Sequence, residues 1–180
     1  MIALSQLDLI TVRPEGPERH RGLLSAGDTV LPCALGRSGV TRRKREGDGA
    51  SPAGIWPLRH VLYRPDRIAR PVTKLDVQAI SPADGWCDDP ADPEYNRHVK
   101  LPYPAGAERL WREDGVYDIV VVLGHNDDPP VPGMGSAIFL HVCKPGYPPT
   151  HGCVAVERAD LEELLQRAHP GDSVEIRQAR

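Results

Sequence analysis

The residues best suited to covalent chemistry lie in the last third of the sequence, in the run Thr150-His151-Gly152-Cys153. A cysteine attacks acyl carbon atoms as its thiolate, and a neighbouring imidazole can take up the thiol proton. His141 stands at the end of a predicted strand, from which a Pro/Gly loop returns the chain to this run. Gly152 allows a close backbone approach, and the amides around it could bind an oxyanion. We therefore predict that Cys153 is a nucleophile, with Thr150 and His151 available for orientation or proton transfer.

A helix is predicted soon after Cys153. Leucines and alanines recur at helical spacing between Glu157 and His169, and Pro170-Gly171 ends the pattern. The positive end of a helix dipole favours a thiolate. We therefore expect the start of this helix to help activate Cys153.

Other kinds of cysteine chemistry fit the spacing less well. A phosphatase-like Cys-x5-Arg pattern fails because only four residues separate Cys153 from Arg158. A papain-like order would need a histidine far downstream, where only His169 at the end of the helix is available. Zinc is disfavoured because His141-x-Cys143 and His151-x-Cys153 are spaced more tightly than usual zinc ligands. We expect no metal and no cofactor.

Composition and charge exclude several classes of protein. The chain has 180 residues, is 40% hydrophobic and has a net charge of −3, which fits one globular domain over residues 1–180 and gives no basic surplus for nucleic acid. The basic run Arg42-Arg43-Lys44-Arg45 is either a solvated loop or edge strand, or a contact for an anionic substrate or envelope polymer. No apolar run is long enough to span a membrane. The first ten residues lack the features of a signal peptide, and the four cysteines need not form a disulfide framework.

The predicted elements are mainly strands. Strands are expected at 7–12, 55–63, 117–123, 136–143 and 172–177, and a hairpin at 21–35 turns at Gly27-Asp28. Pro57 is placed at a sheet edge because it lacks an N–H. Residues 81–106 are predicted to be rich in loops, with Trp86, Tyr95 and Tyr103 as packing anchors. These elements predict a mainly β fold with one or two short helices, a sandwich or partly open barrel.

Two segments of the sequence resemble the motifs of a known family. The run from Ser136 through Val154 contains His141, a spacer, and then Thr-His-Gly-Cys followed by an apolar residue, which is similar to the signature of the L,D-transpeptidase (YkuD-type) catalytic domain. The segment from Lys44 to Gly54, with Glu46-Gly47-Asp48, resembles a second motif of that family. The two motifs occur in the family's order, and the motif-bearing part covers about residues 36–180.

The resemblance implies an L,D-transpeptidase-like fold, an envelope or periplasmic location and a peptidoglycan stem peptide as substrate. It places Cys153 as nucleophile, His141 as general base and an oxyanion hole near Gly152, with Thr150 and His151 shaping the site. The thiolate would attack an L-to-D amide and form a thioester, which an amine or water would then resolve.

The chain departs from the family pattern at two points. The spacer between His141 and Thr150 is short, and Ala155 replaces the Arg or Asn usual two places after the cysteine. Arg158, Arg45 or Lys44 are the candidates to supply the missing substrate contact. Two alternatives therefore stay open beside the transferase: a thiol amidase or carboxypeptidase, and a cell-wall-binding domain without catalysis. With no signal peptide visible, a cytoplasmic location is also open.

Overall fold

The computed structural model describes residues 7–179, and most of its strands form one sheet of nine. The order across this sheet is β11-β12-β13-β3-β2-β1-β14-β6-β7. Its strands are β1 (Leu9–Pro14), β2 (Arg21–Ala26), β3 (Thr29–Ala34), β6 (Gly54–Tyr63), β7 (Val77–Ala79), β11 (Ile119–Leu123), β12 (Phe139–Val142), β13 (Val154–Val156) and β14 (Ser173–Ile176). Residues 1–6, part of the segment in which no signal peptide was recognised, lie outside the described residues.

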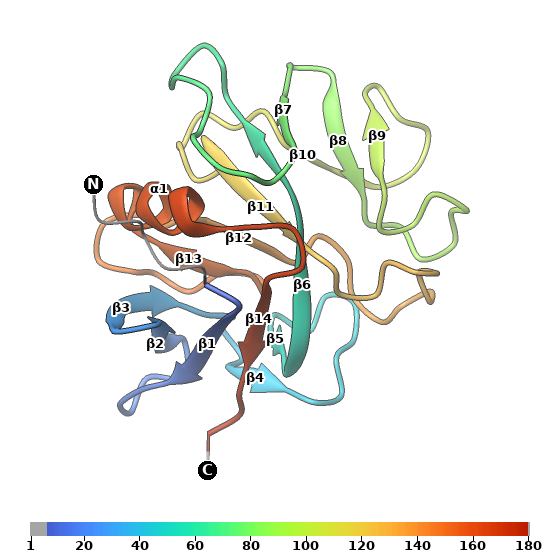
Figure 1. The fold of residues 1–180 in the computed structure, drawn as a ribbon. Helices are drawn as coiled ribbons and strands as arrows, with labels where there is room; N and C mark the ends of the chain where they lie inside the picture. The colour runs from blue at the N-terminus through green and yellow to red at the C-terminus, as the bar shows by residue number, and fades with distance from the viewer. Residues whose placement is uncertain (1–6, 180) are drawn as a thin grey trace.

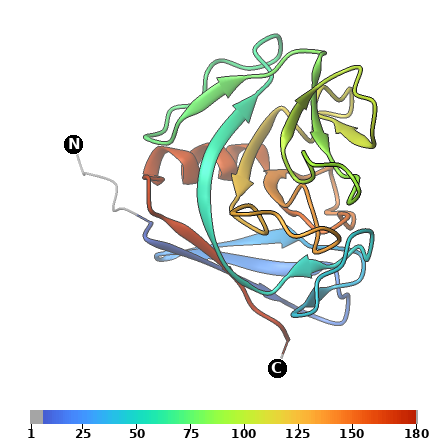
Figure 2. The same cartoon turned by 90° about the vertical axis from the view of Figure 1, so that its right-hand side faces the viewer.

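The long strand β6 closes this sheet into a partly closed barrel (Figures 1 and 2). Its first half pairs with β14 and its second half pairs with both β7 and β11. Pro57 therefore lies inside the sheet, and its predicted place at an edge is wrong. The carbonyl of Pro57 accepts a hydrogen bond from Gly124 N at 2.8 Å, a contact for which proline needs no N–H.

Two smaller sheets and one helix complete the described chain. β10 (Ala107–Arg109), β8 (Asp84–Cys87) and β9 (His98–Lys100) form a three-stranded sheet, and β4 (Val40–Thr41) pairs with β5 (Ser51–Pro52). The helix α1 (Arg158–Arg167) confirms the predicted helical pattern, and it is not long and apolar enough to cross a membrane. The mainly β fold with one helix agrees with the predicted fold class.

The strands β11, β12 and β13 separate two hydrophobic cores. Val121, Leu140 and Val154 face the barrel interior, where Leu161 and Leu165 of α1 also pack. Alternate residues of β11 and β12, such as Val120, Val122 and Phe139, face the opposite side and pack under the three-stranded sheet, as does Cys153 directly before β13. Strand alternation thus places the candidate nucleophile outside the barrel, beneath a second layer.

The segment 46–50 packs tightly against the end of β3. A Cβ added at Gly36 would lie 2.4 Å from the carbonyl oxygen of Gly49 and 2.8 Å from the amide of Ser51. Gly36 also forms an isolated parallel bridge with Thr150, so the same glycine joins the segment 46–50 to the loop that carries Cys153.

Replacing Gly36 with alanine is therefore expected to destabilise the fold, because backbone atoms cannot move aside as a side chain can. We expect a loss of about 2–3 kcal/mol in the free energy of unfolding, measured by denaturant titration. Gly146→Ala is the control: no atom lies within 4 Å of its added Cβ, so only its positive φ should cost stability, about 1 kcal/mol. Equal losses in both variants would contradict the tight packing at Gly36.

Candidate active site

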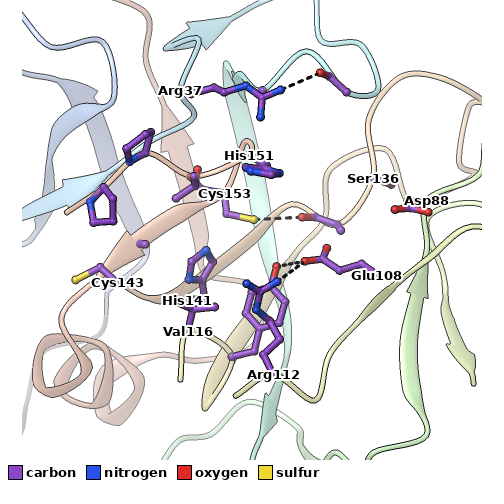
Figure 3. Close-up of a pocket in the computed structure, with 18 of the residues that line it drawn as sticks. Arg37, Asp88, Glu108, Arg112, Val116, Ser136, His141, Cys143, His151 and Cys153 are labelled. Atoms are coloured by element: carbon purple, nitrogen blue, oxygen red, sulfur yellow. Dashed lines mark hydrogen bonds and ion pairs between the residues drawn. The ribbon is translucent and has the colours of Figure 1, made fainter. Parts of the chain in front are cut away.

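A cavity of about 610 Å³ opens between the outer face of the barrel and the surrounding loops. Cys153, His141, Thr150 and His151 all line it (Figure 3). The lining is rich in charge, with cationic side chains from Arg37, Lys44, Arg112 and Lys144, and acidic side chains from Glu46, Asp88 and Glu108. The residues singled out from the sequence for chemistry are thus brought together in a polar pocket.

Parallel pairing of β12 and β13 sets the relation between the two central residues. His141 is the register partner of Ala155, and Leu140 is the partner of Val154. Because side chains alternate along a strand, His141, Ala155 and Cys153 share one face of the sheet. In Figure 3 the imidazole of His141 and the side chain of Cys153 both lie in the pocket, and the thiol of Cys153 is directed towards the carbonyl oxygen of Ala137.

The imidazole of His141 is oriented by its own backbone neighbourhood. Nδ1 lies 2.9 Å from the carbonyl oxygen of Val142, so Nδ1 carries the proton and Nε2 is the basic nitrogen. Burial lowers the pKa of His141 to about 4, and the charge of Arg112 adds to this shift, whereas the Val142 contact opposes it. The ring is therefore neutral near pH 7.

The thiol of Cys153 is also neutral at rest. Its side chain is buried and donates to the carbonyl oxygen of Ala137 at 3.2 Å. Burial raises its pKa to about 12, and the carboxylate of Glu108 adds to the increase. Activation by a helix start is wrong, because the strand β13 separates Cys153 from α1, which begins at Arg158.

The turn that presents Cys153 is built around Thr150. The hydroxyl of Thr150 donates to the Cys153 carbonyl at 2.7 Å and accepts from Gly152 N at 3.1 Å. Gly152 has a φ of 139°, and an added Cβ would lie 2.9 Å from the carbonyl oxygen of Ala50. Any other residue at 152 would push the turn away from the segment 46–50, which explains the glycine.

The Glu-Gly-Asp segment forms one wall of the pocket. Asp48 accepts hydrogen bonds from Arg45 N and Ala50 N, both at 2.8 Å, and forms an ion pair with Lys44. Glu46 accepts from the hydroxyls of Tyr95 and Ser136. Asp48 thereby fixes the segment through contacts within it, and Glu46 joins it to Tyr95 and Ser136 elsewhere in the chain.

The structure separates the three cations suggested for substrate contact. Lys44 is buried and lines the pocket. Arg45 is exposed and directs Nη1 towards the sulfur of Met134, and Arg158 forms an ion pair with Asp118; neither lines the pocket. Of the basic run 42–45, Arg42, Arg43 and Arg45 are exposed while Lys44 is not.

Several pocket residues were not predicted from the sequence. Glu108, Arg112 and Tyr117 form a connected group on the side formed by the three-stranded sheet and the loop that follows it. Arg37 and Lys144 lie in loops, and no local motif marks them. A carboxylate or guanidinium in a loop is ordinarily solvated, so only the tertiary structure reveals their common location.

No set of three or more His, Cys, Asp or Glu side chains within residues 7–179 is arranged to hold a metal ion. Cys33, Cys87, Cys143 and Cys153 are all free thiols. The pocket itself contributes a thiol from Cys153, an imidazole from His141 and several fixed charges.

Comparisons with solved structures return two L,D-transpeptidases of Mycobacterium tuberculosis. L,D-transpeptidase 1 matches with 12% identity and a TM-score of 0.41, over 96% of this chain and 62% of that chain. L,D-transpeptidase 3, solved with a faropenem-derived adduct, matches with 15% identity and a TM-score of 0.44, over 93% of this chain and 60% of that chain. This chain thus spans less than two thirds of either structure.

No curated protein matches the sequence. The model of the L,D-transpeptidase catalytic domain, YkuD, matches residues 17–176, which include the segment 46–50, His141 and the run 150–153. This match covers most of the chain. The chain therefore belongs to the YkuD family of L,D-transpeptidase catalytic domains.

Proposed function

We propose that this chain is a cysteine acyltransferase that acts on peptidoglycan stem peptides through a thioester acyl-enzyme. The observation that supports it best is a neutral imidazole with a basic Nε2 on the same sheet face as a buried thiol, in one pocket. The domain family supplies the class of substrate. Within this proposal Cys153 is the nucleophile and His141 is the general base.

The proposed acylation starts from a neutral pair. With a thiol pKa of about 12 and an imidazole pKa of about 4, the resting state is thiol and imidazole, not thiolate and imidazolium. The thiol proton therefore passes to Nε2 of His141 as the sulfur attacks the amide carbon. The same proton then goes to the departing amine, and a thioester remains on Cys153.

The oxyanion formed during attack needs hydrogen-bond donors that are already in place. Gly152 N is engaged by the hydroxyl of Thr150 within the turn. We therefore assign the donor role to the amides of His151 and Cys153, with Gly152 and Thr150 shaping the turn. This assignment keeps Thr150 in the shaping role that the resemblance implied and moves His151 from shaping the site to donating to the oxyanion.

Substrate carboxylates would meet the cations that line the pocket. Lys44 is the candidate within the motif, although Asp48 neutralises much of its charge. Arg37 lines the pocket, and its guanidinium packs against Gly49 and donates to the carbonyl oxygen of Gly47 at 3.5 Å. Arg45 and Arg158 would need to leave their present partners, so Lys44 and Arg37 fit this role better.

Transfer to an amine is consistent with the acidic side chains that line the pocket. Neither Glu46 nor Asp88 forms an ion pair among the described residues, and both line the pocket. Burial and the neighbouring Glu46 raise the pKa of Asp88. Bringing an ammonium group to these carboxylates is electrostatically favourable, which supports an amine acceptor over water.

Hydrolysis by a thiol amidase or carboxypeptidase is the second candidate function, and it would use the same thiol and imidazole. A binding domain without catalysis is the third.

The peptidoglycan substrate places the protein in the periplasm or cell envelope within this proposal. Fractionation of cells that carry the native gene, with a tag at the C-terminus, tests this location.

The reaction and the nucleophile are tested together by intact-mass spectrometry with a muropeptide donor. The wild-type chain should acquire one acyl adduct, mapped to Cys153, and an added amine should convert it to a crosslinked product. Cys153→Ala should form no adduct, while Cys143→Ala, the control in the same pocket, should retain it. Free acids as the only product would contradict transfer, and an adduct on Cys153→Ala would contradict the assigned nucleophile.

Replacement of His141 by glutamine is expected to slow acylation by about two to four orders of magnitude, because a positioned general base contributes about that much. Stopped-flow acylation by a carbapenem measures the rate. His151→Gln is the matched control, since it changes the histidine of the turn but leaves the proposed base. A mild effect at His141 with a large one at His151 would transfer the role of base to His151.

In His141→Gln, which lacks the proposed base, alkylation of Cys153 by iodoacetamide should rise with pH through the neutral range and continue to rise to about pH 10. Burial raises the thiol pKa to about 12, so the thiolate fraction increases about tenfold with each pH unit below that value. Site-resolved mass spectrometry at a series of pH values gives the rate for Cys153 alone. A plateau near pH 7 in this variant would show a stabilised thiolate and would contradict the raised pKa of the Cys153 thiol.

A further inference from the structure

We propose that Tyr117, held in place by Glu108 and Arg112, is the positioning residue of His141. This inference deepens the proposed function, because it concerns the geometry of the same general base. It rests on contacts that join the candidate base to a second sheet.

Hydrogen bonds alone do little to fix the orientation of the His141 ring. Among residues 7–179 its one hydrogen bond is to the carbonyl oxygen of Val142, the next residue in the chain. No carboxylate or amide side chain orients it, although many catalytic imidazoles have such a partner. The ring direction must therefore also depend on the side chains packed against it.

Tyr117 supplies that packing. Its ring meets the imidazole of His141 edge-on, with centroids 5.3 Å apart and planes at 77°. Tyr117 also packs against Phe139, at 5.8 Å and 80°, so it contacts two residues of β12 that share one face. The backbones are joined at the same level, because Val142 N donates to the carbonyl of Val116 at 3.1 Å. A shift of Tyr117 would therefore change the packing against the His141 imidazole, the proposed base.

Tyr117 is itself fixed from two directions. Its hydroxyl donates to Oε1 of Glu108 at 2.7 Å, and Glu108 belongs to β10 in the three-stranded sheet. The guanidinium of Arg112 lies 5.1 Å from the centre of the tyrosine ring. Arg112 is held in turn by a bidentate pair with Asp114, at 3.0 and 2.7 Å, and lies 3.7 Å from Glu108. Figure 3 shows Glu108 and Arg112 meeting below the thiol.

The hydroxyl of Tyr117 indicates that this side chain does more than fill space in the core. A phenylalanine would fill the same volume and keep the contact with His141. Only the tyrosine reaches across to β10, so it joins the second sheet to the strand that carries the base. A hydrogen bond to a carboxylate is stronger and more directional than one between neutral groups. It is therefore suited to keeping a ring at one angle.

The test compares Tyr117→Phe, which keeps the ring and loses the bond to Glu108, with Tyr117→Leu, which loses both. The readout is the rate at which iodoacetamide alkylates Cys153 at pH 7, relative to Cys143 in the same sample. We expect a fall of about threefold for Tyr117→Phe and about ten- to a hundredfold for Tyr117→Leu, since a small displacement of a catalytic group costs that much. The alkylation of Cys143 should not change.

Tyr103→Phe is the matched control. It also removes a bond from a tyrosine hydroxyl to a carboxylate, to Asp92 at 2.7 Å, but Tyr103 does not line the pocket. The ratio for Cys153 should stay at the wild-type value in this variant. A ratio within twofold of wild type in both Tyr117 variants would overturn the proposal.

A second readout does not depend on reactivity. The ¹⁵N resonances of the His141 imidazole should report a proton held on Nδ1 in the wild-type chain, and mixed tautomers or broadened signals in Tyr117→Leu. Unchanged resonances in folded Tyr117→Leu would likewise overturn the proposal. If the wild-type chain forms no muropeptide adduct while these signals respond to Tyr117, the proposed function fails and the positioning role stands. If the adduct forms and neither the alkylation ratio nor the ¹⁵N resonances change in the Tyr117 variants, the proposed function stands and the positioning role fails.

Discussion

The parallel pairing of β12 with β13 is the constraint on which the candidate site depends. It puts His141 and Cys153 on one face of the sheet and Leu140 and Val154 on the other. A slip of β13 by one residue against β12 would turn Cys153 into the barrel interior and Val154 out of it, while His141 would stay on the outer face. The two residues are therefore held together by the same alternation that builds the hydrophobic core, and the energy of that core protects their geometry. The short loop between the strands needs only to return the chain to the start of β13 in the parallel direction.

Burial then decides how the pair is charged. The second layer that covers β11–β13 removes Cys153 and His141 from water, which disfavours both the thiolate and the imidazolium. The pair is consequently neutral at rest, and in the proposed reaction charge would develop only during acylation. Fixed charges nearby influence that step in opposite senses, because Arg112 favours the thiolate whereas Glu108 opposes it. A buried neutral thiol is also shielded from unwanted oxidation, since oxidation follows thiolate character and exposure.

Local patterns predicted the strand that carries His141 and the residues within the site's motifs, but not the strand that follows Cys153 or the residues that meet the motifs from elsewhere. The hairpin at 21–35, the strand near 119–123 and the single helix follow from alternation, β-branched runs and helical spacing. The three-residue strand β13 was missed because so short an apolar run cannot be distinguished from the approach to a helix, and the helix-dipole hypothesis failed with it. Residues 81–106, which contain β8 and β9, were expected to be rich in loops, since Pro, Gly and Asp interrupt them. Glu108, Arg112 and Tyr117 are distributed over β10 and the loop after it, so only the fold brings them to His141.

Ala155 illustrates how position in the sheet limits what a residue can supply. It is the register partner of His141 on one side and of Ala34 on the other, and it is almost fully buried. Its methyl group lines the pocket but carries no charge, so the charges around the pocket must come from the surrounding loops and from the second sheet. Those elements can change length and composition without disturbing the pairing that places Cys153 beside His141. Under the proposed function, the barrel would supply the nucleophile and base, and the covering layer would determine which charged groups of a substrate can approach them.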